Sequence, residues 1–238
     1  LIEKTKAKSV QYEAMCAAAD TIPFARKKSG GFSSSVPGVV KVVDNHLREF
    51  VEDADQNLKY LGLVGMEKLL VSHPGHVQKH ASTILSCLAD IDITIKMQAL
   101  RLIDGIVSAD NLIPICNQLC NYLETEPAGP YRDALGFKIV QICSRNRYAN
   151  VRDFGWYISI LIDKVCRVES SEYEEQIAAQ LVNVVIRVPP VQPVAVKMLI
   201  PMLETTTPSP SPQSDQDDDS DDDDEEDDDE SEEEDEDE

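Results

Sequence analysis

The stretch DQNLKYLGL, residues 55–63, is followed 37 positions later by the similar stretch DITIKMQAL, residues 92–100. Each copy begins with Asp, a residue that caps helix N-termini, and each carries Lys four positions further on. Small or apolar residues then recur at the spacing of one buried helix face: Leu58, Gly62, Gly65, Met66 and Leu69 in the first copy, and Ile95, Ala99, Leu102, Ile103 and Ile106 in the second.

A helical unit that repeats at this length predicts an all-α fold, a HEAT/armadillo-like right-handed α-solenoid of about ten helices. A weaker third copy of the repeat is expected at residues 151–155, with Ile158 and Ile162 continuing its stripe. Pro, Gly and Asp residues mark the expected helix ends, and they place the helices at residues 2–20, 39–51, 56–71, 77–88, 92–107, 112–123, 131–143, 151–168, 172–187 and 191–203. In the helix at 39–51, the buried stripe is expected to consist of Val39, Val43, Leu47 and Phe50.

The charge divides the chain into two parts. The net charge is −22, but residues 205–238 hold 21 Asp or Glu and no Lys or Arg, which leaves 23 acidic against 22 basic residues in 1–204. We therefore expect residues 1–204 to form the solenoid. Residues 205–238 are expected to be a Pro/Ser linker and a disordered acidic tail, because this segment has nothing apolar to bury and its like charges repel.

The cysteine pattern favours a cytosolic protein with reduced thiols. The six cysteines, Cys16, Cys87, Cys116, Cys120, Cys143 and Cys166, lie mostly in apolar helical stretches and contain no CxxC pair. No stretch is apolar enough for a membrane span, and residues 1–8 are too charged for a secretory signal. Because the chain does not begin with Met, we expect it to be a piece of a longer protein.

Three clusters suggest chemistry, and each has a plainer interpretation. His73, His76 and His80 have a spacing that could hold zinc, but the sequence favours exposed polar residues at a surface turn. Cys116 and Cys120 lie one helical turn apart among apolar neighbours, which favours core packing over metal ligation. Phe154, Trp156 and Tyr157 could form an aromatic ligand box, but the single Trp is better explained as a packing anchor between repeats.

Other functional signals are weak or absent. Residues 26–28, Arg-Lys-Lys, could touch a phosphate-rich surface, although a solvated loop is favoured. No nucleophile elbow, phosphate-binding loop or dinucleotide turn occurs, and the acidic run lacks the glycine-turned geometry of a calcium-binding EF-hand. The sequence therefore predicts no enzyme activity, no catalytic residue, no cofactor and no metal, and it leaves the binding residues unknown.

Several motifs resemble the adaptin family of large adaptor-complex subunits. The helix start EDADQNLKYLGL, residues 52–63, is similar to the adaptin motif EDxDxNLKYLGL and is followed by a similar His73-Pro74 corner. The stretches FGWYISIL at 154–161, IAAQ at 177–180 and IRV at 186–188 favour the delta type within that family. Gly155 departs from the acidic residue expected before the Trp-Tyr pair. The resemblance covers roughly residues 5–204, so the acidic tail inherits no role from it.

The resemblance implies a vesicle-coat scaffold that holds a beta-type large chain, a medium chain and a small chain. It also implies recruitment to Golgi and endosomal membranes through an Arf-type small GTPase. The alternative is a solenoid carrier or histone-chaperone-like protein, because an acidic tail suits basic clients. That alternative predicts an acidic or Trp-rich concave surface, whereas residues 1–204 are nearly neutral and contain a single Trp.

Overall fold

The computed structural model describes residues 2–25, 36–167 and 171–206, and these residues form helices and turns without any β-strand. The predicted acidic tail and the basic residues at 26–28 lie outside the described residues. The α-helices are α1 (Lys8–Thr21), α2 (Val36–Val51), α3 (Gln56–Ser72), α4 (Pro74–Val77), α5 (Ala81–Ser86), α6 (Ile93–Ile106), α7 (Leu112–Thr125), α8 (Pro130–Tyr148), α9 (Phe154–Asp163), α10 (Ser171–Arg187) and α11 (Gln192–Thr206), with short 3₁₀ turns η1 (Ile22–Ala25), η2 (Gln78–His80), η3 (Cys87–Ala89), η4 (Val165–Arg167) and η5 (Pro189–Val191).

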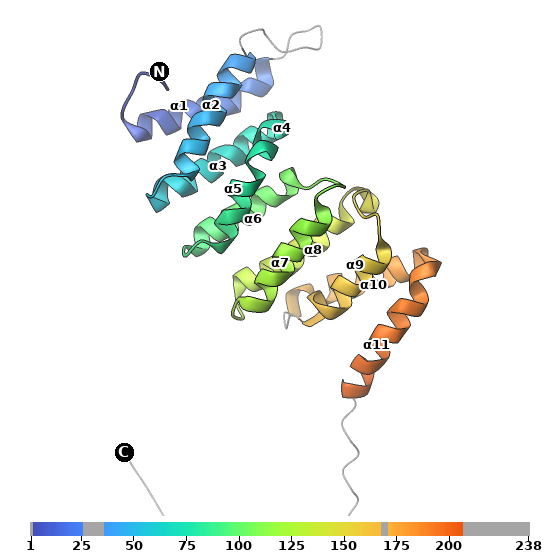
Figure 1. The fold of residues 1–238 in the computed structure, drawn as a ribbon. Coiled ribbons are helices and arrows are strands. Elements are labelled where there is room, and N and C mark those ends of the chain that lie inside the picture. Colours follow the sequence, from blue (N-terminus) through green and yellow to red (C-terminus); the bar gives the residue numbers. More distant parts are fainter. Residues whose placement is uncertain (1, 26–35, 168–170, 207–238) are drawn as a thin grey trace, which may run out of the picture.

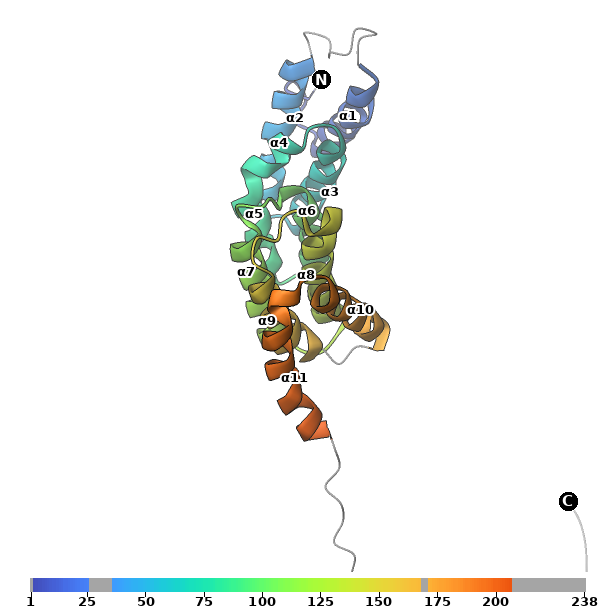
Figure 2. The same cartoon turned by 90° about the vertical axis from the view of Figure 1, so that its right-hand side faces the viewer.

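The helices stack in two layers (Figure 2). The first layer runs α1, α3, α6, α8 and α10, with each helix packed on the next, and the second layer runs α2, α4 with α5, α7, α9 and α11. One apolar core continues between the layers along the whole stack. The predicted α-solenoid is therefore confirmed, and the extended form of the molecule is visible in Figure 1.

Aspartate caps start three of the helices, and two of these caps, Asp55 and Asp92, are the ones that the sequence predicts. The Oδ1 atoms of Asp55 and Asp92 accept the backbone N–H groups of Asn57 and Thr94, each at 2.8 Å. Asp153 accepts the backbone N–H of Trp156 at 3.1 Å. A carboxylate at this position satisfies a backbone donor that has no partner inside the helix.

The third copy of the repeat forms a helix where the sequence pattern predicts one, but in a different layer from the first two copies. Asp153 does cap a helix, and Ile158 and Ile162 are buried, but this helix is α9, which lies in the second layer. The position after α6 in the first layer belongs to α8, which begins at Pro130 behind Gly129 and has no Asp cap. An aspartate cap marks where a helix begins, and the layer is decided by tertiary packing.

The predicted stripe of α2 also needs correction at its first residue. The side chain of Val39 is 40% exposed, whereas Val43, Leu47 and Phe50 are buried as expected. Val36 and Val40 complete the buried face instead. The sequence placed the start of this helix three residues too late, which left Val36 out of the expected stripe, and it included Val39 in place of its buried neighbour Val40.

The helix expected at 77–88 is broken into short pieces. The first piece, α4, begins earlier than expected, at Pro74, and η2 and η3 interrupt the run on either side of α5. In the described residues, no single helix is long and apolar enough to cross a membrane. Helices α10 and α11 satisfy the length and composition only as a pair, and that pair is bent by 111° at its break.

Two glycines of the repeat lie where α3 approaches α2 most closely. A Cβ atom on Gly62 would lie 2.7 Å from Val51 Cγ2 and 2.8 Å from the backbone nitrogen of Val51. A Cβ atom on Gly65 would lie 2.2 Å from Cδ2 of Leu47. Glycine in the interior of a helix destabilises it, so its presence needs a reason. The close contact with α2 supplies that reason at both positions.

Replacing Gly62 with Leu should lower the free energy of unfolding by about 1–3 kcal/mol, because a side chain there meets the backbone of α2, which cannot rotate away. Gly38→Ala is the matched control: nothing lies within 4 Å of its Cβ position, so the exchange should leave the stability unchanged or raise it slightly. Urea unfolding of the two variants measures both values. Equal stability of wild type and Gly62→Leu would contradict the described α2–α3 contact.

Candidate functional site

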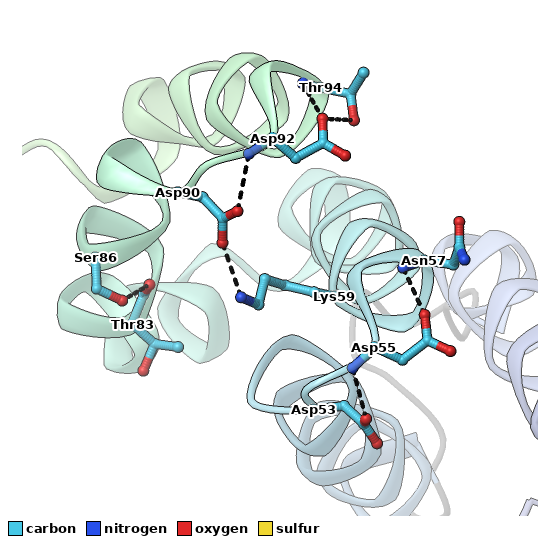
Figure 3. A network of polar contacts seen from close by, with 9 residues as sticks. All are labelled: Asp53, Asp55, Asn57, Lys59, Thr83, Ser86, Asp90, Asp92 and Thr94. Atoms are coloured by element: carbon cyan, nitrogen blue, oxygen red, sulfur yellow. Dashed lines mark hydrogen bonds and ion pairs between the residues drawn. The ribbon is translucent and has the colours of Figure 1, made fainter.

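A network of polar side chains joins consecutive repeats at the start of α3 and α6 (Figure 3). Lys59 Nζ on α3 donates to Asp90 Oδ2 at 2.8 Å, in the turn that precedes α6. Asp90 Oδ1 accepts the backbone N–H of Asp92 at 3.1 Å, so the same carboxylate also orders the turn. One repeat earlier, Asp53 accepts the backbone N–H of Asp55 at 3.0 Å in the equivalent way. The Lys of the repeat therefore links one repeat to the next.

The second copy makes the same link. Lys96 Nζ on α6 donates to Glu126 Oε1 at 2.6 Å, in the turn that precedes α8, and lies 5.0 Å from the centre of the Tyr131 ring. The Tyr131 hydroxyl donates to the backbone oxygen of Leu88 at 2.9 Å and so reaches the second layer. The sequence singled out the two lysines only as markers of the repeat. An acidic residue just ahead of the next helix was the signal that could have revealed their partners.

Buried polar side chains form a further set of bridges. The three buried polar or charged residues among the described ones are Asp44, Gln98 and Lys138. Gln98 Nε2 on α6 donates to Glu67 Oε2 on α3 at 2.6 Å. Lys138 Nζ on α8 donates to Asp104 Oδ2 on α6 at 2.8 Å. Each bridge therefore spans neighbouring elements of the stack, and this satisfies groups whose burial alone would be costly.

Asp44 forms the third bridge and corrects the interpretation of the histidines. His76 Nδ1 lies 3.1 Å from Asp44 Oδ2, and His80 Nε2 lies 2.8 Å from Asp44 Oδ1. Asp44 is 7% exposed and both histidines are partly buried, so describing them as exposed surface residues was wrong. His73 instead packs edge-on against His76, with ring centres 6.2 Å apart. The available signal was a charged residue on the apolar stripe of α2, between Val43 and Leu47.

In the part of the chain that the structure describes, no three His, Cys, Asp or Glu side chains are arranged to hold a metal ion. The cysteines lie in the core: five are buried and Cys166 is partly exposed. Cys116 Sγ lies 3.7 Å from Cys143 Sγ on α8, and a hydrogen bond between these two thiols together with burial raises the pKa of Cys116. Burial also raises the pKa of Cys120 to about 12. Thiols held protonated in this way are poor nucleophiles and poor metal ligands.

The aromatic side chains form a packed cluster instead of an open box. Tyr157 is fully buried, and its ring centre lies 6.0 Å from that of Tyr148, which is 5.8 Å from the ring of Phe154. Trp156 is only partly buried against the core. The Tyr157 hydroxyl is buried with no hydrogen-bond partner among the described residues, and burial raises its pKa.

Two open grooves lie on the surface of the part of the chain that the structure describes. A groove of 610 Å³ lies between the ends of α3, α6 and α8 and is lined by Val71, Gln78, Ser108, Arg145 and Asn150 among others. Another, of 590 Å³, lies between α1 and α2 and is mostly apolar, lined by Ile2, Ala14, Ala17, Val39 and Val42 among others. Among the described residues that line these two grooves, no hydroxyl or thiol is hydrogen-bonded to a base.

The comparisons with known proteins agree with this architecture. Residues 1–214 match the model of the adaptin N terminal region. The chain belongs to that family. It is 38% identical over 205 residues to the AP-3 complex subunit delta-1 of Bos taurus, and 37% identical over 174 residues to the AP-3 complex subunit delta of Dictyostelium discoideum.

These matches cover much of the chain and little of the relatives. The aligned parts make up 86% and 73% of this adaptin chain but only 17% and 15% of the two relatives. A solved structure titled as a homology model of the full-length AP-3 complex in an intermediate open conformation matches with a TM-score of 0.64 and 24% identity, over 85% of this chain and 38% of the other. At this identity the structural match supports the fold alone.

Removing the orphan hydroxyl of Tyr157 should stabilise the protein. Tyr157→Phe should raise the free energy of unfolding by about 1 kcal/mol, or Tm by about 2–4 °C, because a buried hydroxyl without a partner is costly. Tyr131→Phe is the matched control, since it deletes a buried hydroxyl that donates to Leu88, and should lower stability by about 1 kcal/mol. Calorimetry of both variants tests the pair. A loss of stability in Tyr157→Phe as large as in Tyr131→Phe would show that its hydroxyl has a partner.

The Lys59–Asp90 link should make part of the stability depend on pH. Burial alone would raise the pKa of Asp90, but hydrogen bonds from Lys59 and the backbone of Asp92 outweigh it and hold the pKa below its usual 3.8. A carboxyl with a lowered pKa stabilises the fold above its unfolded-state pKa, and this contribution is lost as the pH falls through the folded-state pKa.

Asp90→Asn should therefore lower the free energy of unfolding by about 1–3 kcal/mol at pH 7, and the difference from wild type should shrink as the pH falls below 3.8. Asp53→Asn is the matched control, since Asp53 holds the same turn in the previous repeat without a lysine partner among the described residues. Asp53→Asn should lower the free energy of unfolding by less than Asp90→Asn does. If the difference in free energy of unfolding between Asp90→Asn and wild type stays constant down to pH 2, the pKa of Asp90 is not the source of the pH dependence.

Proposed function

We propose that the chain is a non-enzymatic scaffold subunit of a vesicle-coat adaptor complex. The observation that carries the proposal is the similarity of 86% of the chain to an AP-3 delta subunit. The fold supports it, because stacked helix pairs present long surfaces whose affinity comes from many packed contacts.

Membership of the adaptin family supports the partners and the route that we propose. The chain binds a beta-type large chain, a medium chain and a small chain of the adaptor complex, and an Arf-type small GTPase recruits the complex. It is cytoplasmic and associates peripherally with Golgi and endosomal membranes, where it acts in protein transport and cargo sorting between Golgi, endosomes and lysosome-like organelles. Several weak sites in one complex add up to avid binding on a membrane that carries many cargoes.

Within this proposal the chain has two parts with separate roles. Residues 1–204 are the solenoid trunk that makes the subunit contacts, and residues 205–238 are an acidic appendage with no contribution to assembly. The trunk is nearly neutral, and the 21 acidic residues that follow it would be repelled by an anionic membrane surface. Membrane association therefore runs through partners or through the trunk.

Co-purification from the native cell tests this function. The full chain and a chain truncated after Thr206 should recover the same adaptor subunits, identified by mass spectrometry. Equal recovery supports the trunk as the scaffold. Loss of every partner on truncation, with histones or other basic proteins recovered only by the full chain, would contradict the proposal and favour the carrier or chaperone-like alternative.

A further inference from the structure

The backbone between α8 and α9 is strained. At the end of α8 the chain leaves right-handed helix geometry: Arg145 is extended, with φ −55° and ψ 138°, and the three residues after it are left-handed. Their φ angles are 50° at Asn146, 58° at Arg147 and 65° at Tyr148. Asn tolerates this conformation, but it is costly for Arg and Tyr because Cβ comes too close to the following carbonyl oxygen. Among the described residues, these three are the only non-glycine residues with positive φ.

The strained turn lies at the boundary between two parts of the stack (Figure 1). We call α1–α8 the N-terminal block and α9–α11 the C-terminal block. The three buried polar bridges described above all join elements within the N-terminal block. The ion pairs that join the N-terminal block to described residues after the turn, Arg152–Asp110 and Lys164–Glu124, are exposed. Exposed ion pairs contribute little to stability, so the polar links are weakest at the boundary where the backbone is strained.

Tyr148 holds the strained turn in its described position. The Tyr148 hydroxyl donates to Gln180 Oε1 on α10. The Tyr148 ring lies 5.8 Å from the ring of Phe154 and 6.0 Å from that of Tyr157, both on α9. Its backbone oxygen accepts the N–H of the buried Val151 at 3.0 Å. These contacts reach two helices of the C-terminal block, so they offset the strain only while that block stays where it is.

The other side of the turn borders open space. Arg145, Asn146 and Asn150 line the groove of 610 Å³ between the ends of α3, α6 and α8. The side chains of Asn146 and Arg147 are exposed, and neither forms a hydrogen bond or ion pair with another described residue. Arg145 donates to the backbone oxygen of Asp104 and so fixes the start of the turn to the N-terminal block. The turn can therefore relax into the groove while its first residue stays in place.

We propose that residues 146–148 are a strained joint at which the C-terminal block pivots against the N-terminal block, with Tyr148 as its latch. The described arrangement is the latched one. When Tyr148 leaves Gln180, the backbone at Arg147 and Tyr148 returns to the right-handed or extended region and the strain is released. A few residues that absorb a large change in φ and ψ are the usual form of a hinge. This inference goes beyond the scaffold role and does not depend on which proteins the chain binds.

The reactivity of one buried thiol reports on the joint. Cys143 on α8 is fully buried. Burial and the nearby Cys143 thiol both raise the pKa of Tyr157, which places this thiol next to α9. Pivoting of α9 away from α8 would expose Cys143, whereas Cys87, buried in η3 of the N-terminal block, would stay covered. Alkylation of the native full chain with N-ethylmaleimide, resolved by mass spectrometry for each cysteine, measures both rates.

Three variants test the strain and the latch. Arg147→Gly should slow alkylation of Cys143 by about fivefold or more, because glycine adopts the left-handed conformation without strain and the latch stays closed. Arg147→Ala is the matched control: it removes the same side chain but keeps the strain, so Cys143 should react as in wild type. Tyr148→Phe should speed alkylation of Cys143 by about three- to tenfold, because it loses the hydrogen bond to Gln180 and keeps the ring. The rate at Cys87 should be the same in all four proteins.

Three outcomes would overturn the proposal. Equal rates of Cys143 alkylation in Arg147→Gly and Arg147→Ala would show that the turn stores no strain. An unchanged rate in Tyr148→Phe would show that the hydroxyl is not a latch. Changes at Cys87 as large as those at Cys143 would show that the whole stack opens as one unit, and then no joint separates the two blocks.

Discussion

The structure depends on the fact that no single helix pair of this chain can bury its own apolar surface. Each pair has apolar side chains toward the pair before it and the pair after it, so burial is complete only in the stack. The close approach of α3 to α2 at Gly62 and Gly65 shows how little room remains between neighbours. The two layers and the continuous core between them follow from this requirement.

Apolar contact alone would allow neighbouring repeats to slide along each other, and the buried polar bridges oppose this. Asp44 with His76 and His80, Gln98 with Glu67, and Lys138 with Asp104 each join elements of adjacent repeats. A shift by one helical turn would leave these groups buried without partners, which costs far more than the apolar surface could regain. The Lys59–Asp90 and Lys96–Glu126 ion pairs also oppose sliding, because each joins a helix to the turn before the next repeat.

The sequence predicted the fold class and most of the helix positions because both depend on local signals. Aspartate caps, the spacing of Leu58 to Leu69 and the proline at 74 all act within a few residues of where they stand. The layer of each helix depends on contacts distant in the chain, and for this reason the sequence did not reveal that the third copy, α9, lies in the second layer. The histidines were misjudged for the same reason, since their partner Asp44 is more than 30 residues away. The surface grooves could not be predicted, because exposure of residues such as Val71 is a property of the whole stack.

A scaffold of this kind binds through surfaces spread over several repeats, and this is the central claim about the protein. The most direct measurement is hydrogen–deuterium exchange of the chain alone and within its native assembly. Partners that bind a solenoid scaffold should slow the exchange in several helices across successive repeats, including elements of α3, α6 and α8. Slowed exchange confined to a single groove, or to residues 207–238 alone, would contradict the account and show that one local site or the acidic segment holds the partners.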